Sequence, residues 1–181
     1  MKKIFLLPFL FIFSNSSFAQ DSTLTDSSHW LKQISVFAGT GYPEIINGGV
    51  RLQYNHKNQI GLLGNFFRSH KNETKVFIIA AEHFTHFGKE KLNSELLPEF
   101  FFRTSFAYLV INVEKTGFEY LSDQYFGIEF ALGKNFLFKN LGGITADIGF
   151  FAILYKMYDA DENILPLYPN IRLQIFINSK K

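Results

Sequence analysis

Large apolar residues alternate with small or charged ones most clearly at residues 125–133. Every second residue from Phe126 to Leu132 is large and apolar, whereas the residues between them are glycine, alanine and Glu129. Successive side chains of a β-strand point to opposite faces, so one face of this stretch is apolar and the other is small with a single charge. This pattern favours a strand with lipid on its outer side and a polar, tightly filled interior.

The same kind of alternation predicts eight strands along the chain. They cover residues 33–40, 47–54, 59–67, 75–84, 99–112, 125–133, 142–154 and 170–178. Tilted strands of about 9–11 residues suffice to cross a bilayer, and an even number of them closes without an unpaired edge in lipid. We therefore expect an all-β fold, a single antiparallel up-and-down transmembrane β-barrel of about eight strands, over residues 33–178.

The connections between the predicted strands indicate an orientation. Outer-membrane barrels have long outward loops and short inward turns. The expected outward loops are residues 41–46, 68–74, 113–123 and 155–169, and the expected inward turns are 55–58, 85–98 and 134–141. We therefore expect the chain to enter and leave the barrel on the periplasmic side.

The first 19 residues have the features of an export signal. Lys2 and Lys3 are followed by an apolar run at 4–13 and by a small-x-small cleavage site at 17–19. We expect a cleaved signal peptide at 1–19, a periplasmic tail at 20–32 and a short C-terminal tail at 179–181. The apolar run is too short to span about 30 Å of hydrocarbon, and no second run long enough to span as a helix follows.

Composition agrees with an exported membrane barrel. The chain holds 23 phenylalanines and 8 tyrosines but no cysteine, so it forms no disulfide and carries no cysteine-linked lipid. Signal cleavage would remove Lys2 and Lys3 from the 18 basic residues and leave the rest equal in number to the 16 acidic ones. A neutral chain without a basic run gives no electrostatic basis for nucleic-acid binding. The predicted location is the cell outer membrane.

The lipid-facing parity of each strand should carry no charge. An arginine near the membrane midplane on the lipid face costs about 2–4 kcal/mol. The charged residues that this rule places inside the barrel are Arg51, Glu82, Arg103, Glu129, Asp147 and Arg172. Because an eight-stranded barrel is only wide enough for side chains to fill it, we expect these charges to pair as a structural plug. A gated pore or a proton path is the functional alternative.

A histidine and a hydroxyl group lie close together at residues 82–86. On a strand, His83 and Thr85 share one face while Glu82 lies on the other. The His-x-Thr pair faintly resembles the lipid A deacylase barrels, and this resemblance implies a weak catalytic alternative at His83 and Thr85. An interfacial histidine is the simpler interpretation, so we expect no enzyme.

Metal and cofactor sites have little support in the chain. Residues 159–163 match the opening D-x-D-x-N of a calcium loop, but Ile164 stands where glycine is needed and Asn170 where a bidentate glutamate is needed. The histidines are scattered and cysteine is absent, and no phosphate-binding glycine loop occurs. We therefore expect no metal and no cofactor.

Three features together suggest a family: the export signal, Phe-Ala-Gly-Thr-Gly at 37–41, and the hairpin with Phe-Ala-Leu-Gly-Lys and Asp-Ile-Gly-Phe at 130–150. With them the chain resembles small outer-membrane β-barrel proteins, most nearly the Bacteroidetes-type outer-membrane β-barrel domain family. The resemblance implies outer-membrane lipid and the outer-membrane assembly machinery as partners. It names no extracellular partner, because most members of such families have no defined function.

Three functional hypotheses follow. The first is a non-enzymatic integral outer-membrane barrel with a structural, envelope-integrity or surface-interaction role. The second is an outer-membrane lipid-modifying enzyme that uses His83 and Thr85. The third is a soluble periplasmic barrel that binds an apolar ligand, in which case the apolar faces of the strands should line the interior and the exterior should be polar.

Overall fold

The computed structural model describes the barrel and most of its turns. The described residues are 33–42, 46–55, 57–69, 74–88, 98–114, 120–138, 141–156 and 167–179. The predicted signal peptide at 1–19, the predicted tail at 20–32 and the acidic stretch at 159–163 lie outside the described residues, as do residues 180 and 181.

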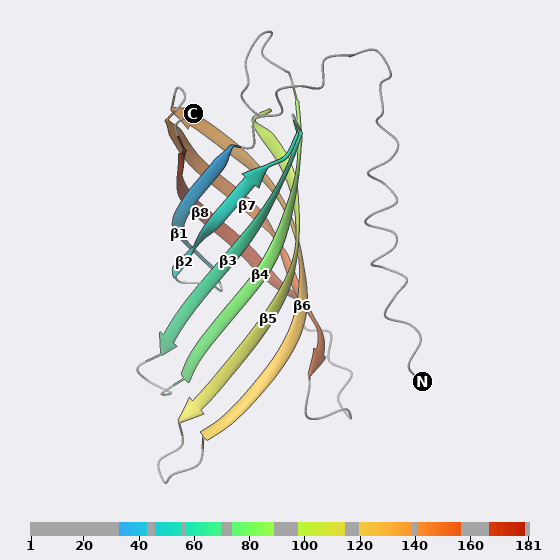
Figure 1. Ribbon diagram of the computed structural model, residues 1–181. Helices are drawn as coiled ribbons and strands as arrows, with labels where there is room; N and C mark the ends of the chain where they lie inside the picture. The colour runs from blue at the N-terminus through green and yellow to red at the C-terminus, as the bar shows by residue number, and fades with distance from the viewer. Residues whose placement is uncertain are drawn as a thin grey trace. The chain divides into compact units, whose positions relative to one another are not determined.

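Eight antiparallel strands form one closed barrel in which each strand pairs with the next and β8 also pairs with β1 (Figure 1). The strands are β1 (Ile34–Tyr42), β2 (Ile46–Gln53), β3 (Asn58–Ser69), β4 (Thr74–Phe87), β5 (Phe100–Glu114), β6 (Tyr120–Phe138), β7 (Gly142–Lys156) and β8 (Leu167–Asn178). This arrangement confirms the predicted all-β, up-and-down barrel of eight strands. Within the described residues, no helix is long and apolar enough to cross a membrane.

The predicted bounds of the sixth strand were wrong. β6 has 19 residues and includes Lys134 and Asn135, which were expected in a turn at 134–141. Lys134 points outward and lies over the rings of Phe100 and Phe136, at 5.1 and 5.2 Å from their centroids. Asn135 is buried inside and accepts a hydrogen bond from Thr145 Oγ1 at 2.8 Å. Two adjacent polar residues broke the apolar pattern in the sequence, although each has a partner that keeps it in the strand.

The strands differ in length around the barrel. β1 and β2 have 9 and 8 residues, whereas β5 and β6 have 15 and 19. The long strands β5 and β6 extend well past β1 and β2 at the end of the barrel where β1 ends and β2 begins (Figure 1). We call this end the loop end, and we call the opposite end, which holds the β2–β3 turn, the turn end.

The outer wall is apolar and the interior is largely polar. Phe130 and Ile177 are 44% and 67% exposed, whereas their inward neighbours Glu129 and Phe176 are buried. Residues that are fully buried include Arg103 and Gln174. The barrel therefore reverses the usual arrangement of a soluble domain, in which charged residues are almost never fully buried.

Apolar side chains flank Glu82 along the inner face of β4. Along β4, the inward residues Ile78 and Ala80 lie on the loop side of Glu82, and Phe84 lies on its turn side. Gly133 on β6 leaves room for the inward ring of Phe101, since a Cβ at this glycine would meet that ring. Glu82 therefore lies between apolar side chains of its own strand, although polar side chains such as Asn47 and His86 are also buried in the lumen.

Candidate functional site

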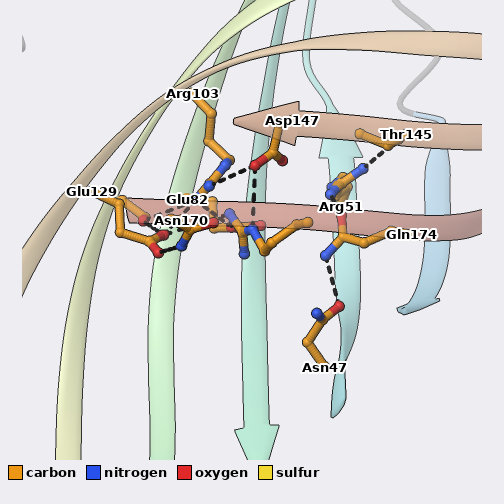
Figure 2. A network of polar contacts seen from close by, with 11 residues as sticks. Asn47, Arg51, Glu82, Arg103, Glu129, Thr145, Asp147, Asn170 and Gln174 are labelled. Atoms are coloured by element: carbon orange, nitrogen blue, oxygen red, sulfur yellow. Dashed lines mark hydrogen bonds and ion pairs between the residues drawn. The ribbon is translucent and has the colours of Figure 1, made fainter. Parts of the chain in front are cut away.

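The candidate site is a cluster of buried charges at the middle of the barrel (Figure 2). Arg103 on β5 is its centre: Nη1 donates to Glu82 Oε1 at 3.3 Å and Nη2 donates to Asp147 Oδ1 at 3.0 Å. The same guanidinium also donates to Glu129. One arginine therefore contacts carboxylates from β4, β6 and β7.

Arg172 on β8 contacts the same three carboxylates. Its Nη2 lies 2.7 Å from Glu82 Oε1 and 3.5 Å from Glu129 Oε2, and its Nε lies 3.6 Å from Asp147 Oδ1. The side chains of both arginines are fully buried. We call Arg103, Arg172 and the three acids the five-residue cluster.

The strand register brings these residues together. Glu82 pairs with Ser105 across β4 and β5, and Ser105 pairs with Glu129 across β5 and β6, so the three side chains lie side by side on the inner face. Asp147 pairs with Arg172 across β7 and β8. Because the barrel is closed, these two groups face each other through the lumen.

Neutral side chains complete the hydrogen bonding of the acids. Glu129 accepts hydrogen bonds from Ser105 Oγ and from Asn170 Nδ2. Hydrogen bonds from fixed neutral donors stabilise a buried carboxylate without adding a further charge. Ser105 and Asn170 were not among the predicted site residues, although both lie on the inward parity of their strands.

Arg51 lies apart from the five-residue cluster. Its Nη1 donates to Thr145 Oγ1 at 3.4 Å and its Nη2 donates to Gln174 Oε1. The guanidinium carbon lies 4.2 Å from the ring centroid of Phe37 and 4.4 Å from that of Phe84. Among the described residues, no carboxylate forms an ion pair with Arg51. The expectation that all six charges pair with one another therefore does not hold for this arginine.

A small cavity lies near Arg51 toward the turn end. Its volume is about 20 Å³, and its lining includes Ser35, Gln59 and Asn135. That volume has room for a single water molecule. The side chains of the five-residue cluster are almost fully buried, and the cavity beside Arg51 is small, which agrees with the narrow interior of a barrel of eight strands.

The structure does not join the two residues of the catalytic alternative. His83 Nε2 shares a hydrogen bond with Tyr54 Oη at 2.8 Å on the outer wall. No hydrogen bond links His83 to Thr85 in the part of the chain that the structure describes, and Glu82 points into the lumen instead. A histidine that activates a hydroxyl nucleophile must reach it within hydrogen-bond distance, and this geometry lacks that contact.

The remaining member of that sequence cluster, His86, is buried at the turn end. Its Nδ1 lies 3.0 Å from Pro98 O and its Nε2 lies 3.2 Å from Gln59 Oε1. Both ring nitrogens are thus occupied by oxygen atoms of the protein. Among the described residues, no group of three or more His, Asp and Glu side chains is arranged to hold a metal ion.

The fold is that of eight-stranded barrels of known structure. Neither a scan against models of protein families nor a search of curated proteins finds a match. Among solved structures, the N-terminal β-barrel domain of Pseudomonas aeruginosa OprF is similar, with a TM-score of 0.54 and 11% identity over 81% of this chain and 96% of that one. Neisserial surface protein A (NspA) is also similar, with a TM-score of 0.51 and 8% identity over 82% of this chain and 95% of that one. At these identities the likeness shows a shared fold.

Proposed function

We propose that this protein is an integral outer-membrane β-barrel with a side-chain-filled lumen and a structural, envelope-integrity or surface-interaction role. The observation that carries the proposal is the reversed arrangement of the wall: apolar side chains face outward on the strands while charged side chains are buried inside. The solved structures with a similar fold are outer-membrane barrels of eight strands. The resemblance to the Bacteroidetes-type barrel family rests on sequence patterns alone.

The outer face of β8 has the height that a membrane requires. Its outward residues Leu167, Ile171, Leu173, Ile175 and Ile177 are all apolar and more than half exposed. Ten residue steps at about 3.3 Å each give about 33 Å along the strand, and a tilt of about 40° reduces this to about 25 Å. This is the height of the apolar band of outer-membrane barrels, about 25 Å.

Exposed tyrosines lie toward the loop end of the outer wall. Tyr42 ends β1, Tyr155 is close to the end of β7, and Tyr168 is close to the start of β8. Amphipathic rings concentrate where the hydrocarbon meets the headgroups, and outer-membrane barrels have aromatic girdles at both interfaces. These positions support a membrane interface at the loop end of the strands.

The interior does not suit a soluble barrel that carries an apolar ligand. Such a barrel needs an apolar cavity and a polar exterior. Here the middle of the lumen holds the five-residue cluster, and the exterior exposes apolar side chains far beyond the few hundred Å² that soluble monomers tolerate. The arrangement favours lipid outside and a plugged lumen inside.

Fractionation of cells that express the full chain tests the proposal. We expect the protein in the outer-membrane fraction, with faster migration on a detergent gel before boiling than after it, because a closed barrel stays folded in cold detergent. Recovery from the soluble periplasm, or identical migration with and without boiling, would refute the proposal.

A further inference from the structure

The small cavity beside Arg51 combines a buried cation with neutral amides. Its volume is about 20 Å³, and the described residues that line it include Arg51, Gln59, Asn135 and Asn178 and no Asp or Glu. Arg51 is 4% exposed, and its Nε has no hydrogen-bond partner among the described residues. Glu82 and Asp147 attract this guanidinium only from beyond ion-pair distance, since both acids form their ion pairs with the other two arginines. A buried polar atom without a partner points to a water molecule or an ion nearby.

The hydrogen bonds around the cavity occupy the oxygens of two lining amides. A guanidinium has no acceptor atom, so Thr145 accepts from Arg51 and donates onward to Asn135 Oδ1 at 2.8 Å (Figure 2). Ser35 Oγ donates to Asn178 Oδ1 at 2.7 Å. Within the described part of the chain, the amide nitrogens of Asn135 and Asn178 donate no hydrogen bond. These N–H groups are therefore the amide atoms left for an acceptor in the cavity.

His86 decides which amide atom Gln59 offers to the cavity. Its Nδ1 lies 3.0 Å from Pro98 O, a carbonyl that can only accept, so Nδ1 carries a hydrogen. Its Nε2 lies 3.2 Å from Gln59 Oε1. An imidazolium donates at both nitrogens and matches these two oxygens, whereas a neutral ring accepts at Nε2 and needs the NH2 group of Gln59 there instead. Protonation of His86 therefore leaves the NH2 group of Gln59 for the cavity, and deprotonation leaves the oxygen.

Charge balance joins the occupant of the cavity to His86. Among the described residues, three buried arginines balance three buried acids, so a lone anion would add an uncompensated charge to the lumen. An anion taken up together with a proton on His86 keeps the balance. Around this ring, Arg51 is the charged group and the neutral side chains are those of Gln59, Phe84 and Phe101. An anion beside Arg51 would also offset the repulsion between the guanidinium and the imidazolium.

We propose that the cavity beside Arg51 binds one chloride ion when His86 is protonated and one water molecule when His86 is neutral. Protonation completes a lining of donors, namely the guanidinium and three amide NH2 groups. Deprotonation turns one of these amides to present its oxygen, which water can satisfy and an anion cannot. A chloride ion is only slightly larger than a water molecule, so the cavity has room for either. The inference goes beyond the proposed function, since it requires a closed barrel but not a particular membrane.

The test measures urea unfolding of the purified, folded barrel in detergent, in sodium chloride or in sodium methanesulfonate at equal ionic strength. Methanesulfonate has the same charge but is too large for a cavity of about 20 Å³. A ligand that binds only the folded state raises the urea midpoint, so a chloride series gives its dissociation constant. We expect chloride to raise the midpoint at about pH 4, below the ordinary histidine pKa of about 6.5. At about pH 8 it should bind about tenfold more weakly or less, within the range typical of coupled sites.

Two variants test the two parts of the site. Arg51→Met removes the guanidinium and His86→Phe removes the ring that binds the proton, so in each variant the two salts should give the same midpoint at both pH values. Each comparison is between two salts on one folded variant, so a general loss of stability does not affect it. Lys134→Gln and His83→Ala remove a cation and a histidine from the outer wall. They are the matched controls and should keep the chloride response of the unmodified chain.

A second measurement needs no variant. In crystals of the unmodified barrel soaked in bromide, anomalous scattering should place a bromide ion beside Arg51 at about pH 4 and none there at about pH 8. Bromide at another position alone, or beside Arg51 equally at both pH values, would overturn the inference.

The unfolding experiment can also overturn it. Equal midpoints in the two salts at about pH 4 would show that the cavity of the unmodified chain holds water only. A chloride effect that is equal at both pH values, or that survives in His86→Phe, would remove His86 from the site, and one that survives in Arg51→Met would place the anion elsewhere. All of these results come from a folded barrel, so they leave the membrane proposal intact, whereas recovery of the protein from the soluble periplasm would refute that proposal instead.

Discussion

The lumen buries arginine in two different ways. Arg103 is surrounded by three carboxylates from three strands, while Arg51 lies between two phenylalanine rings and donates to a hydroxyl and an amide oxygen. Both side chains are almost fully buried. Removal of the first would leave three acids around a single remaining arginine, whereas removal of the second would leave only neutral partners in direct contact. The two arginines are therefore similarly buried, but only Arg103 depends on charged partners in direct contact.

We expect the largest loss of stability for Arg103→Met. Methionine keeps much of the volume but leaves Glu82, Glu129 and Asp147 with Arg172 as their shared cation. Breaking a buried ion pair by removing one partner typically costs about 3–5 kcal/mol, because the survivor stays buried and unpaired. Urea unfolding of the barrel in lipid vesicles measures this loss. The double variant Arg103→Met with Glu129→Gln should lose less than the sum of the two single variants, and strict additivity would contradict the shared cluster.

A smaller effect is expected for Glu82→Gln. Glutamine keeps the shape of the side chain, but it removes the negative charge that Glu82 shares between Arg103 and Arg172. Hydrogen bonds to charged groups are worth about 1.5–3 kcal/mol, and we expect a loss of stability in this range. The same unfolding measurement applies. A variant more stable than the unmodified chain would show that the three acids repel one another more than the two arginines hold them.

Arg51→Met should lower the stability of the barrel less than Arg103→Met or Glu82→Gln. It loses two hydrogen bonds to neutral acceptors, Thr145 and Gln174, and the contact with Phe37 and Phe84, yet a thioether packs well against aromatic rings. We expect a loss of about 1–2 kcal/mol, the size of a cation–π contact and a net hydrogen bond or two. A loss as large as that of Arg103→Met would contradict the distinction between the two sites.

The smallest effect is expected outside the lumen, for His83→Ala. Among the described residues, the one side-chain hydrogen bond of this histidine is the exposed contact with Tyr54. Surface substitutions away from special features usually change stability by less than about 0.5 kcal/mol. Lipid A from cells expressing the variant should also have the same acylation as lipid A from cells expressing the unmodified chain. A difference in acylation would revive the enzymatic hypothesis.

Much of the fold could be predicted from the sequence because strand alternation is a local pattern. The alternation at 125–133, repeated in most other strands, was enough to predict an all-β barrel of eight strands. The bounds of β6 could not be predicted, because Lys134 and Asn135 gain their partners only from neighbouring strands. Local pattern cannot show a partner that lies elsewhere in the chain.

The contacts of the site were harder to predict than its residues. Arg172 meets Glu82 from 90 positions away, and this contact exists because barrel closure brings β8 across the lumen from β4. Neutral partners such as Gln174 share the inward parity of the charges, but parity alone does not separate them from residues that merely fill space. It also could not show that Arg51 would pack between Phe37 and Phe84, since that depends on how the strands are staggered around the barrel.

The proposed membrane barrel requires that the apolar parity of the strands faces lipid and that the other parity faces the lumen. The chain contains no cysteine, so single cysteines at Leu132 and Ala131 report the two faces without background. In vesicles that contain brominated lipid, we predict that Leu132→Cys reacts readily with a fluorophore and that the bromine atoms quench the emission of this fluorophore. Ala131→Cys in the folded barrel should resist labelling. Quenched label at position 131 with protection at position 132 would show that the inner and outer faces are reversed.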